Sequence, residues 1–229
     1  MRGWDTTTVA VGAHMIKGLE KWQGWIREDL FQDIVGLFYE RTMYRQYWNI
    51  VVDAPDVVRS GPQFHSWVRH NYARAVALGL RRQVDQRRDV VSLRRLMIEL
   101  AAASEGVTRE WYVDLAGPDE FLQKRARESF DRWGRDHVER RTVRQDIDRL
   151  VEVTSPAVQW VDSTVAHLGA NRKELEISLK FTDLHEAVDV VVELYKSYST
   201  LLTGAYPAVE QLAVDPWEHI FEAAWARAQ

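Results

Sequence analysis

The residues best suited to chemistry surround one histidine in the last third of the chain. His167 ends the stretch 161–167 (VDSTVAH), and Asn171 and Arg172 follow it closely. Imidazole exchanges a proton near neutral pH without a special environment. RNA cleavage can use this chemistry: a base takes the 2′-hydroxyl proton, that oxygen attacks the adjacent phosphate, and a cationic donor stabilises the added charge. His167 is therefore the candidate proton-transfer group, although a single histidine more often has a structural role.

The neighbours of His167 argue against other catalytic classes. In a regular helix Ser163 and Thr164 lie beside His167, whereas Asp162 lies five residues back and well round the helix. Ser163 lacks a base-orienting acid and an oxyanion loop, so a hydrolase triad is not expected. His185 and Asp189 are four apart on one helical face, but such pairs are common, and we expect no metal site. No glycine-rich phosphate loop is present, and no cofactor is expected.

Helical periodicity predicts the elements that position these residues. Apolar residues three and four apart predict a first helix from about residue 15 to just before Pro55. Arg41 interrupts this stripe, and we expect its stem to lie on apolar surface with the guanidinium reaching outwards. Gly18, Gly24 and Gly36 lie within the same helix and indicate close helix crossings.

A second helix is predicted from Ser60-Gly61-Pro62 to about residue 86, with proline in its first turn. Arg82 and Asp85 are three residues apart on its inward face. Either they form an ion pair with each other, or Arg82 points into a polar site that another helix shares. Ser92 is the predicted N-cap of a short helix that stops near residue 106.

The rest of the chain also has a helical pattern. Residues 105–117 are predicted as a loop, and Pro118-Asp119-Glu120 as a helix start. Residues 119–152 carry nine basic and nine acidic side chains, and their interleaving is typical of a solvated helix rather than a phosphate-binding face. Residues 154–156 predict another helix start, with that helix reaching about residue 168. A loop then leads to a helix capped by Thr182, whose inner apolar line is Leu184, Val188, Val191, Leu194 or Tyr195, and Tyr198. A last short helix is expected after Asp215-Pro216.

Composition limits the classes of protein further. The 229 residues are 46% hydrophobic, enough for one medium-sized domain, which we assign to 14–229 after a loose tail over 1–13. There are no cysteines, no long apolar run and no signal-peptide pattern, which agrees with a cytoplasmic protein and no membrane contact. A net charge of −4 argues against a generally basic nucleic-acid binder but leaves local RNA binding open.

Five segments, in their order and spacing, resemble the abortive-infection U-type branch of the HEPN superfamily, helical proteins of microbial defence and toxin–antitoxin systems. These segments are 37–41 (LFYER), 80–85 (LRRQVD), 92–96 (SLRRL), 165–167 (VAH) and 182–188 (TDLHEAV). The resemblance implies an all-α bundle of about six to seven helices that pairs as a homodimer. It also implies that His167 corresponds to the catalytic histidine and Asp162 to the polar residue after the catalytic arginine.

The arginine itself corresponds to Val161, so this chain departs from the family pattern at one catalytic position. Losing one preorganised donor typically costs about 3 to 4 kcal/mol of transition-state stabilisation. We expect a substitute from elsewhere in the fold, with Arg82 first, Arg41 second and Arg172 third. The sequence leaves two hypotheses: a metal-independent endoribonuclease that uses His167, Asp162 and Arg82, with Arg41, Asn171 and Arg172 near the RNA, or a non-catalytic dimeric binding module. A cognate antitoxin or defence-system protein is the expected protein partner.

Overall fold

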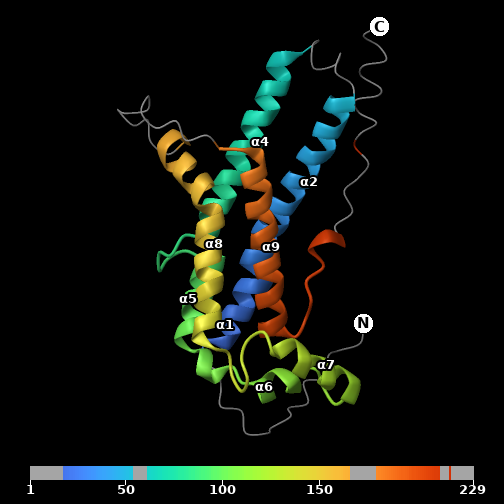
Figure 1. Ribbon diagram of the computed structural model, residues 1–229, viewed down its shortest axis with the longest axis vertical. Coiled ribbons are helices and arrows are strands. Elements are labelled where there is room, and N and C mark those ends of the chain that lie inside the picture. Colours follow the sequence, from blue (N-terminus) through green and yellow to red (C-terminus); the bar gives the residue numbers. More distant parts are fainter. Residues whose placement is uncertain (1–17, 54–60, 166–178, 212–216, 218–229) are drawn as a thin grey trace.

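The computed structural model describes residues 18–53, 61–165, 179–211 and 217, and these residues form an all-α bundle (Figure 1). The helices are α1 (Leu19–Gly24), α2 (Phe31–Asp53), α4 (Pro62–Gln83), α5 (Leu93–Ala102), α6 (Arg109–Asp114), α7 (Glu120–Phe130), α8 (Arg140–Trp160) and α9 (Phe181–Thr203). Within this described part the extended backbone is limited to one isolated bridge between Thr108 and His137. The predicted all-α fold is confirmed.

Four long helices, α2, α4, α8 and α9, run along the long axis of the molecule, and α6 and α7 cover one end (Figure 1). The apolar line predicted for α9 is buried along its length, from Leu184 through Val188 and Val191 to Tyr198, with at most 1% of each residue exposed. Away from α6 and α7, α8 ends beside α4 and close to where α9 begins (Figure 1).

The first helical segment contains a π-helical turn, η1 (Trp25–Leu30), between α1 and α2. The apolar residues Trp22, Ile26, Leu30 and Ile34 follow one another at four-residue steps and are all buried. Such a spacing drifts round a 3.6-residue helix, and the wider π turn keeps the four side chains on one face. Helix α1 begins at Leu19, where Gly18 adopts a φ of 93° in the left-handed region.

Close helix packing occurs at a different glycine from those predicted. A Cβ at Gly24 or Gly36 would meet nothing within 4 Å, so these two residues do not mark helix crossings. At Gly79 in α4, a Cβ would lie 2.6 Å from Cδ2 of Leu37 in α2. Gly79 therefore permits the close approach of α4 to α2.

Several predicted caps are confirmed. Pro62 begins α4, and the Ser92 and Asp119 side chains accept hydrogen bonds from the backbone at the starts of α5 and α7. The cap of α9 was predicted wrongly: α9 begins at Phe181 after Lys180, and the Asp183 carboxylate accepts from the Lys180 N–H at 3.2 Å.

Three predicted boundaries are wrong. Helix α8 continues through Pro156, because a buried face that includes Leu150, Thr154 and Ala157 keeps the segment packed on both sides of the proline. The charged segment 119–152 is divided between α7 and α8 by a turn at Gly134, where φ is 147°. The predicted loop 105–117 contains α6, which is capped by the Thr108 hydroxyl.

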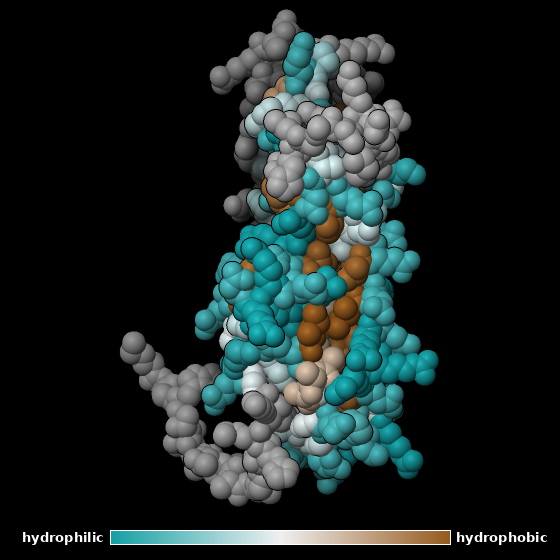
Figure 2. All heavy atoms as spheres, turned by 90° about the vertical axis from the view of Figure 1, so that its left-hand side faces the viewer, coloured by the Kyte–Doolittle hydropathy of each residue, from teal (hydrophilic) through white to brown (hydrophobic). Residues whose placement is uncertain are grey.

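On the side of the bundle that carries α5 and α8, the surface is mostly hydrophilic (Figure 2). A groove between α5 and α8 is lined by Ile98, Ala102 and Ile147 together with Arg140 and Arg144. Figure 2 views the side of the bundle that carries α5 and α8 and shows a narrow hydrophobic strip within polar surface. Across the described segments, none of the helices combines the length and apolarity needed to span a bilayer.

Candidate functional site

The candidate site begins where α8 changes into a π-helical turn, η3 (Val161–Val165). Val161 is only 1% exposed and belongs to the hydrophobic core. The position that the resemblance assigns to arginine therefore carries a buried apolar side chain. π-helical turns occur frequently at functional sites because they alter the direction in which side chains point.

Asp162, the next residue, is half-exposed and forms an ion pair with Arg81 of α4. The Arg81 Nε donates to Asp162 Oδ1 at 2.7 Å, and the two side chains are 44% and 49% exposed. A guanidinium from another helix thus reaches the end of α8. Within the described part of the chain, no hydrogen bond uses the two Nη nitrogens of Arg81, so they are available to an anion.

Arg81 and Asp162 line a cavity of about 480 Å³ between the end of α4, the start of α5 and the end of α8. Its charged lining residues are Arg81, Arg87, Arg94, Asp85 and Asp162. Three guanidinium groups against two carboxylates leave a net charge of +1. An anionic ligand such as a phosphate is therefore favoured in this cavity.

Two of these lining groups are fixed locally. Burial would raise the pKa of Asp85, but hydrogen bonds from the Arg87 backbone and side chain outweigh it and hold the pKa below its ordinary value. Arg94 donates from Nη1 to the Val84 carbonyl at 3.2 Å. The Arg94 Nε is buried and has no hydrogen-bond partner among the described residues.

Arg82, the predicted substitute for the missing arginine, binds elsewhere. Its Nη2 lies 2.9 Å from Oδ2 of Asp33 in α2, and its side chain is 67% exposed. The alternative pairing of Arg82 with Asp85 is not formed, because Asp85 lies beyond the end of α4 and pairs with Arg87 at 3.0 Å. Helix α4 therefore supplies the cation near Asp162, but from Arg81 and not from Arg82.

Arg41 is buried, contrary to the expectation that its guanidinium reaches outwards. Its side chain is 8% exposed and forms an ion pair with Asp189 of α9, and its guanidinium lies 5.0 Å from the centre of the Phe38 ring. The Asp189 carboxylate is therefore already paired with a cation, so it is less available to bind a metal ion together with His185. The described residues contain no group of three or more side chains placed to hold a metal ion.

His167, Asn171 and Arg172 lie outside the described residues. Val165 is the last described residue before them, and Leu179 is the first after them. Their assignment to the site therefore remains a prediction from the sequence.

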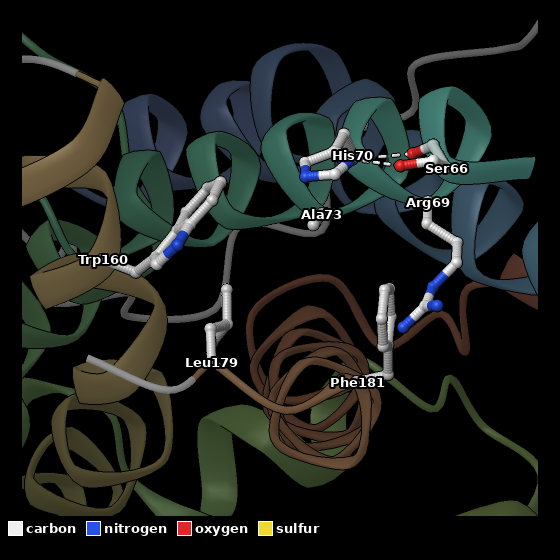
Figure 3. Close-up of a pocket in the computed structure, with 7 residues that line it drawn as sticks. All are labelled: Ser66, Arg69, His70, Ala73, Trp160, Leu179 and Phe181. Carbon is white, nitrogen blue, oxygen red and sulfur yellow. Dashed lines mark hydrogen bonds between the residues drawn. The ribbon is translucent and has the colours of Figure 1, made fainter. Parts of the chain in front are cut away.

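A second cavity, which we call the Arg69–His70 cavity, lies between α4, the end of α8 and the start of α9 (Figure 3). Its volume is about 290 Å³, and it is lined by Ser66, Arg69, His70 and Ala73 of α4, Trp160 of α8, and Leu179 and Phe181 at the start of α9. Arg69 lies 5.3 Å from the centre of the Phe181 ring and 5.7 Å from that of Trp48. Burial raises the pKa of the neighbouring Tyr44 hydroxyl, and the Arg69 guanidinium opposes that shift.

These cavity residues were not predicted from the sequence. Two signals were available: Trp160 directly precedes Val161, the position assigned to the arginine, and Phe181 directly precedes the predicted cap Thr182. Ser66 and His70 are also one helical turn apart on the predicted second helix. Which face of that helix meets α8 and α9 is decided by tertiary packing, so these signals alone did not identify the cavity.

The chain folds as an all-α bundle, and comparison with known families shows the class of protein to which it belongs. The AbiU2 family model of the HEPN group matches residues 19–225. The chain therefore belongs to the AbiU2 family, as the resemblance indicated. No curated protein and no solved structure matches the chain significantly.

Proposed function

We propose that this protein is a metal-independent endoribonuclease whose proton-transfer group is His167 and whose phosphate-binding cation is Arg81. The observation that carries the proposal is the Arg81–Asp162 ion pair at the end of α8. It supplies a guanidinium from another helix beside the position where the family's arginine is replaced by the buried Val161.

The proposed reaction needs one proton acceptor and one fixed cation. The His167 imidazole takes the 2′-hydroxyl proton, the 2′ oxygen bonds to phosphorus, and the bond from phosphorus to the 5′ oxygen breaks. The 5′ oxygen takes up a proton from solvent water, and the products carry a 2′,3′-cyclic phosphate and a 5′-hydroxyl. The Nη groups of Arg81 stabilise the charge on the phosphate oxygens. Asp162 holds Arg81 through Nε and acts as a positioning residue.

The proposal retains the other expectations of the sequence analysis. Asn171 and Arg172 are assigned to RNA binding beside His167, whereas the buried Arg41 supports the fold through Asp189. The proposal also includes a homodimer, a cognate antitoxin or defence-system partner, and action in the cytoplasm.

A second candidate function is a non-catalytic binding module of the same fold. One observation favours it: Arg81, Arg82 and Arg41 each form an ion pair with a carboxylate. Paired guanidinium groups stabilise added phosphate charge less than free ones, because the carboxylate already offsets their charge.

Cleavage of RNA in EDTA separates the two functions. Purified wild-type protein is incubated with total RNA, beside His167→Ala and the control His137→Ala, which changes an exposed histidine between α7 and α8. The nuclease proposal predicts cleavage by wild type and by His137→Ala, with 2′,3′-cyclic phosphate ends, and loss of cleavage in His167→Ala. Absence of cleavage by wild type, or equal cleavage by both variants, contradicts it.

A further inference from the structure

The Arg69–His70 cavity has the chemistry of a nucleotide-binding site. We propose that it binds one nucleotide of single-stranded RNA, with the base between Trp160 and Phe181 and the phosphate at Arg69. This inference rests on the proposed function for one point, that the bound strand is RNA. Binding of the nucleotide does not itself require cleavage.

Charge favours an anion in this cavity. Arg69 is its permanently charged lining residue, and no aspartate or glutamate lines it. Within the described segments no carboxylate forms an ion pair with Arg69, unlike Arg81, Arg82 and Arg41. The rings of Phe181 and Trp48 contact the guanidinium and hold it in position. An arginine that is held by aromatic rings and has no carboxylate partner is preorganised for bidentate binding of a phosphate.

Shape favours a flat ring attached to that anion. Trp160, Leu179, Phe181 and Ala73 form an apolar part of the lining, and Ser66, Arg69 and His70 form the polar part (Figure 3). A free phosphate would leave the apolar part unused. A nucleotide uses both parts, since bases bind by stacking on aromatic side chains while arginine neutralises the backbone.

The hydrogen bond of His70 favours RNA over DNA. Its Nδ1 lies 2.7 Å from the Ser66 carbonyl oxygen, which only accepts, so Nδ1 carries the proton. In the neutral ring Nε2 is then an acceptor, and it points away from Ser66 toward the side of the cavity where Trp160 lies (Figure 3). A 2′-hydroxyl can donate to this nitrogen, whereas deoxyribose has no such donor.

The test is a binding titration with full-length His167→Ala protein, in which the proposed cleavage is removed. Fluorescently labelled octauridylate is titrated in EDTA, and binding is followed by anisotropy. Adding Arg69→Gln should weaken binding roughly tenfold and lower the salt dependence by about one phosphate contact. Adding Arg74→Gln, at an exposed position of α4 outside the cavity, should change affinity less than twofold.

A second comparison uses the sugar. Octauridylate should bind more tightly than the DNA octamer of deoxyuridylate, and His70→Ala should reduce that preference. Equal losses in Arg69→Gln and Arg74→Gln, or absence of octauridylate binding to the parent protein, overturn the inference. Arg69-dependent binding without cleavage by wild type supports this inference and contradicts the nuclease alone. Cleavage with binding that is independent of Arg69 contradicts this inference alone.

Discussion

Two arginines beside aromatic rings, at opposite ends of the bundle, have different surroundings. Near α6 and α7, Arg132 donates to Asp146 at 2.8 Å, and the buried Tyr198 hydroxyl donates to the same carboxylate oxygen at 2.9 Å. At the other end, Arg69 contacts Phe181 and Trp48 and faces a cavity. The first arginine therefore pairs with a largely buried carboxylate, whereas the second has no carboxylate partner among the described residues and presents its charge to a cavity.

The largest expected effect on stability comes from breaking the buried network. Asp146→Ala leaves the buried Tyr198 hydroxyl without its acceptor and leaves the Arg132 guanidinium with only the Ser197 hydroxyl. This loss should cost about 3 kcal/mol in the free energy of unfolding. Asp148→Ala, at an exposed position of the same helix, should change it by less than about 0.5 kcal/mol. Urea denaturation measures the free energy of unfolding of both variants. Similar values would show that the bonds of Asp146 to Tyr198 and Arg132 do not stabilise the fold.

A smaller effect is expected from His185, which lies between the two regions in α9. Burial, followed by the Arg45 and Arg41 guanidinium groups, lowers the pKa of His185 below its ordinary value of 6.5, against the opposing effect of Asp189. Below pH 6.5 the unfolded chain therefore binds a proton at this residue before the folded chain does. Stability should decrease on acidification through this range, by at most about 1.4 kcal/mol per pH unit.

The variant His185→Gln should remove this part of the pH dependence. Unfolding free energies at pH 7.5 and pH 5.5 should differ less in His185→Gln than in wild type, and His137→Gln serves as the matched exposed control. An unchanged pH dependence in His185→Gln would show that the burial of His185 does not affect proton binding.

The surface ion pair of Arg149 and Glu193 should have a smaller effect still. Two hydrogen bonds of 2.8 and 2.7 Å join the side chains, and the Arg149 bond lowers the pKa of Glu193 below 4.5. Both side chains are about half-exposed, so Glu193→Gln should cost about 0.5 kcal/mol at pH 7. The loss should disappear as the pH falls below the lowered pKa. If Glu193→Gln were still less stable than wild type at pH 2, the contribution of Glu193 would come from packing and not from its charge.

The smallest effect on stability is expected at Arg69. Because no described carboxylate pairs with it, Arg69→Gln should change the free energy of unfolding by less than about 0.5 kcal/mol, although it should weaken RNA binding. Urea denaturation of this variant beside Asp146→Ala completes the comparison. If Arg69→Gln lowered the free energy of unfolding nearly as much as Asp146→Ala, Arg69 would also have a structural role.

Local signals in the sequence predicted much of the fold, because caps and apolar periodicity act within a few residues. Pro62, Ser92 and Asp119 mark helix starts as expected, and the inner line of α9 is buried. The π turns and the continuation of α8 through Pro156 depend on packing against other helices, which local signals do not contain.

The candidate site was less predictable, because its contacts join distant residues. Arg41 and Asp189 are 148 positions apart, and Arg81 and Asp162 are 81 apart. Periodicity indicated that α4 presents an arginine to a neighbouring helix. It could not decide between adjacent arginines, since that choice depends on the register between α4 and α8.

Single-turnover cleavage of a defined RNA by Arg81→Gln and Arg82→Gln tests whether Arg81 is the phosphate-binding cation. The two substitutions are chemically identical and adjacent, but only Arg81 bonds to Asp162. We expect Arg81→Gln to slow cleavage roughly 10²- to 10³-fold, as for loss of a preorganised donor, and Arg82→Gln to slow it less than about threefold. Equal rates in the two variants, or a larger loss in Arg82→Gln, would show that Arg81 is not the phosphate-binding cation.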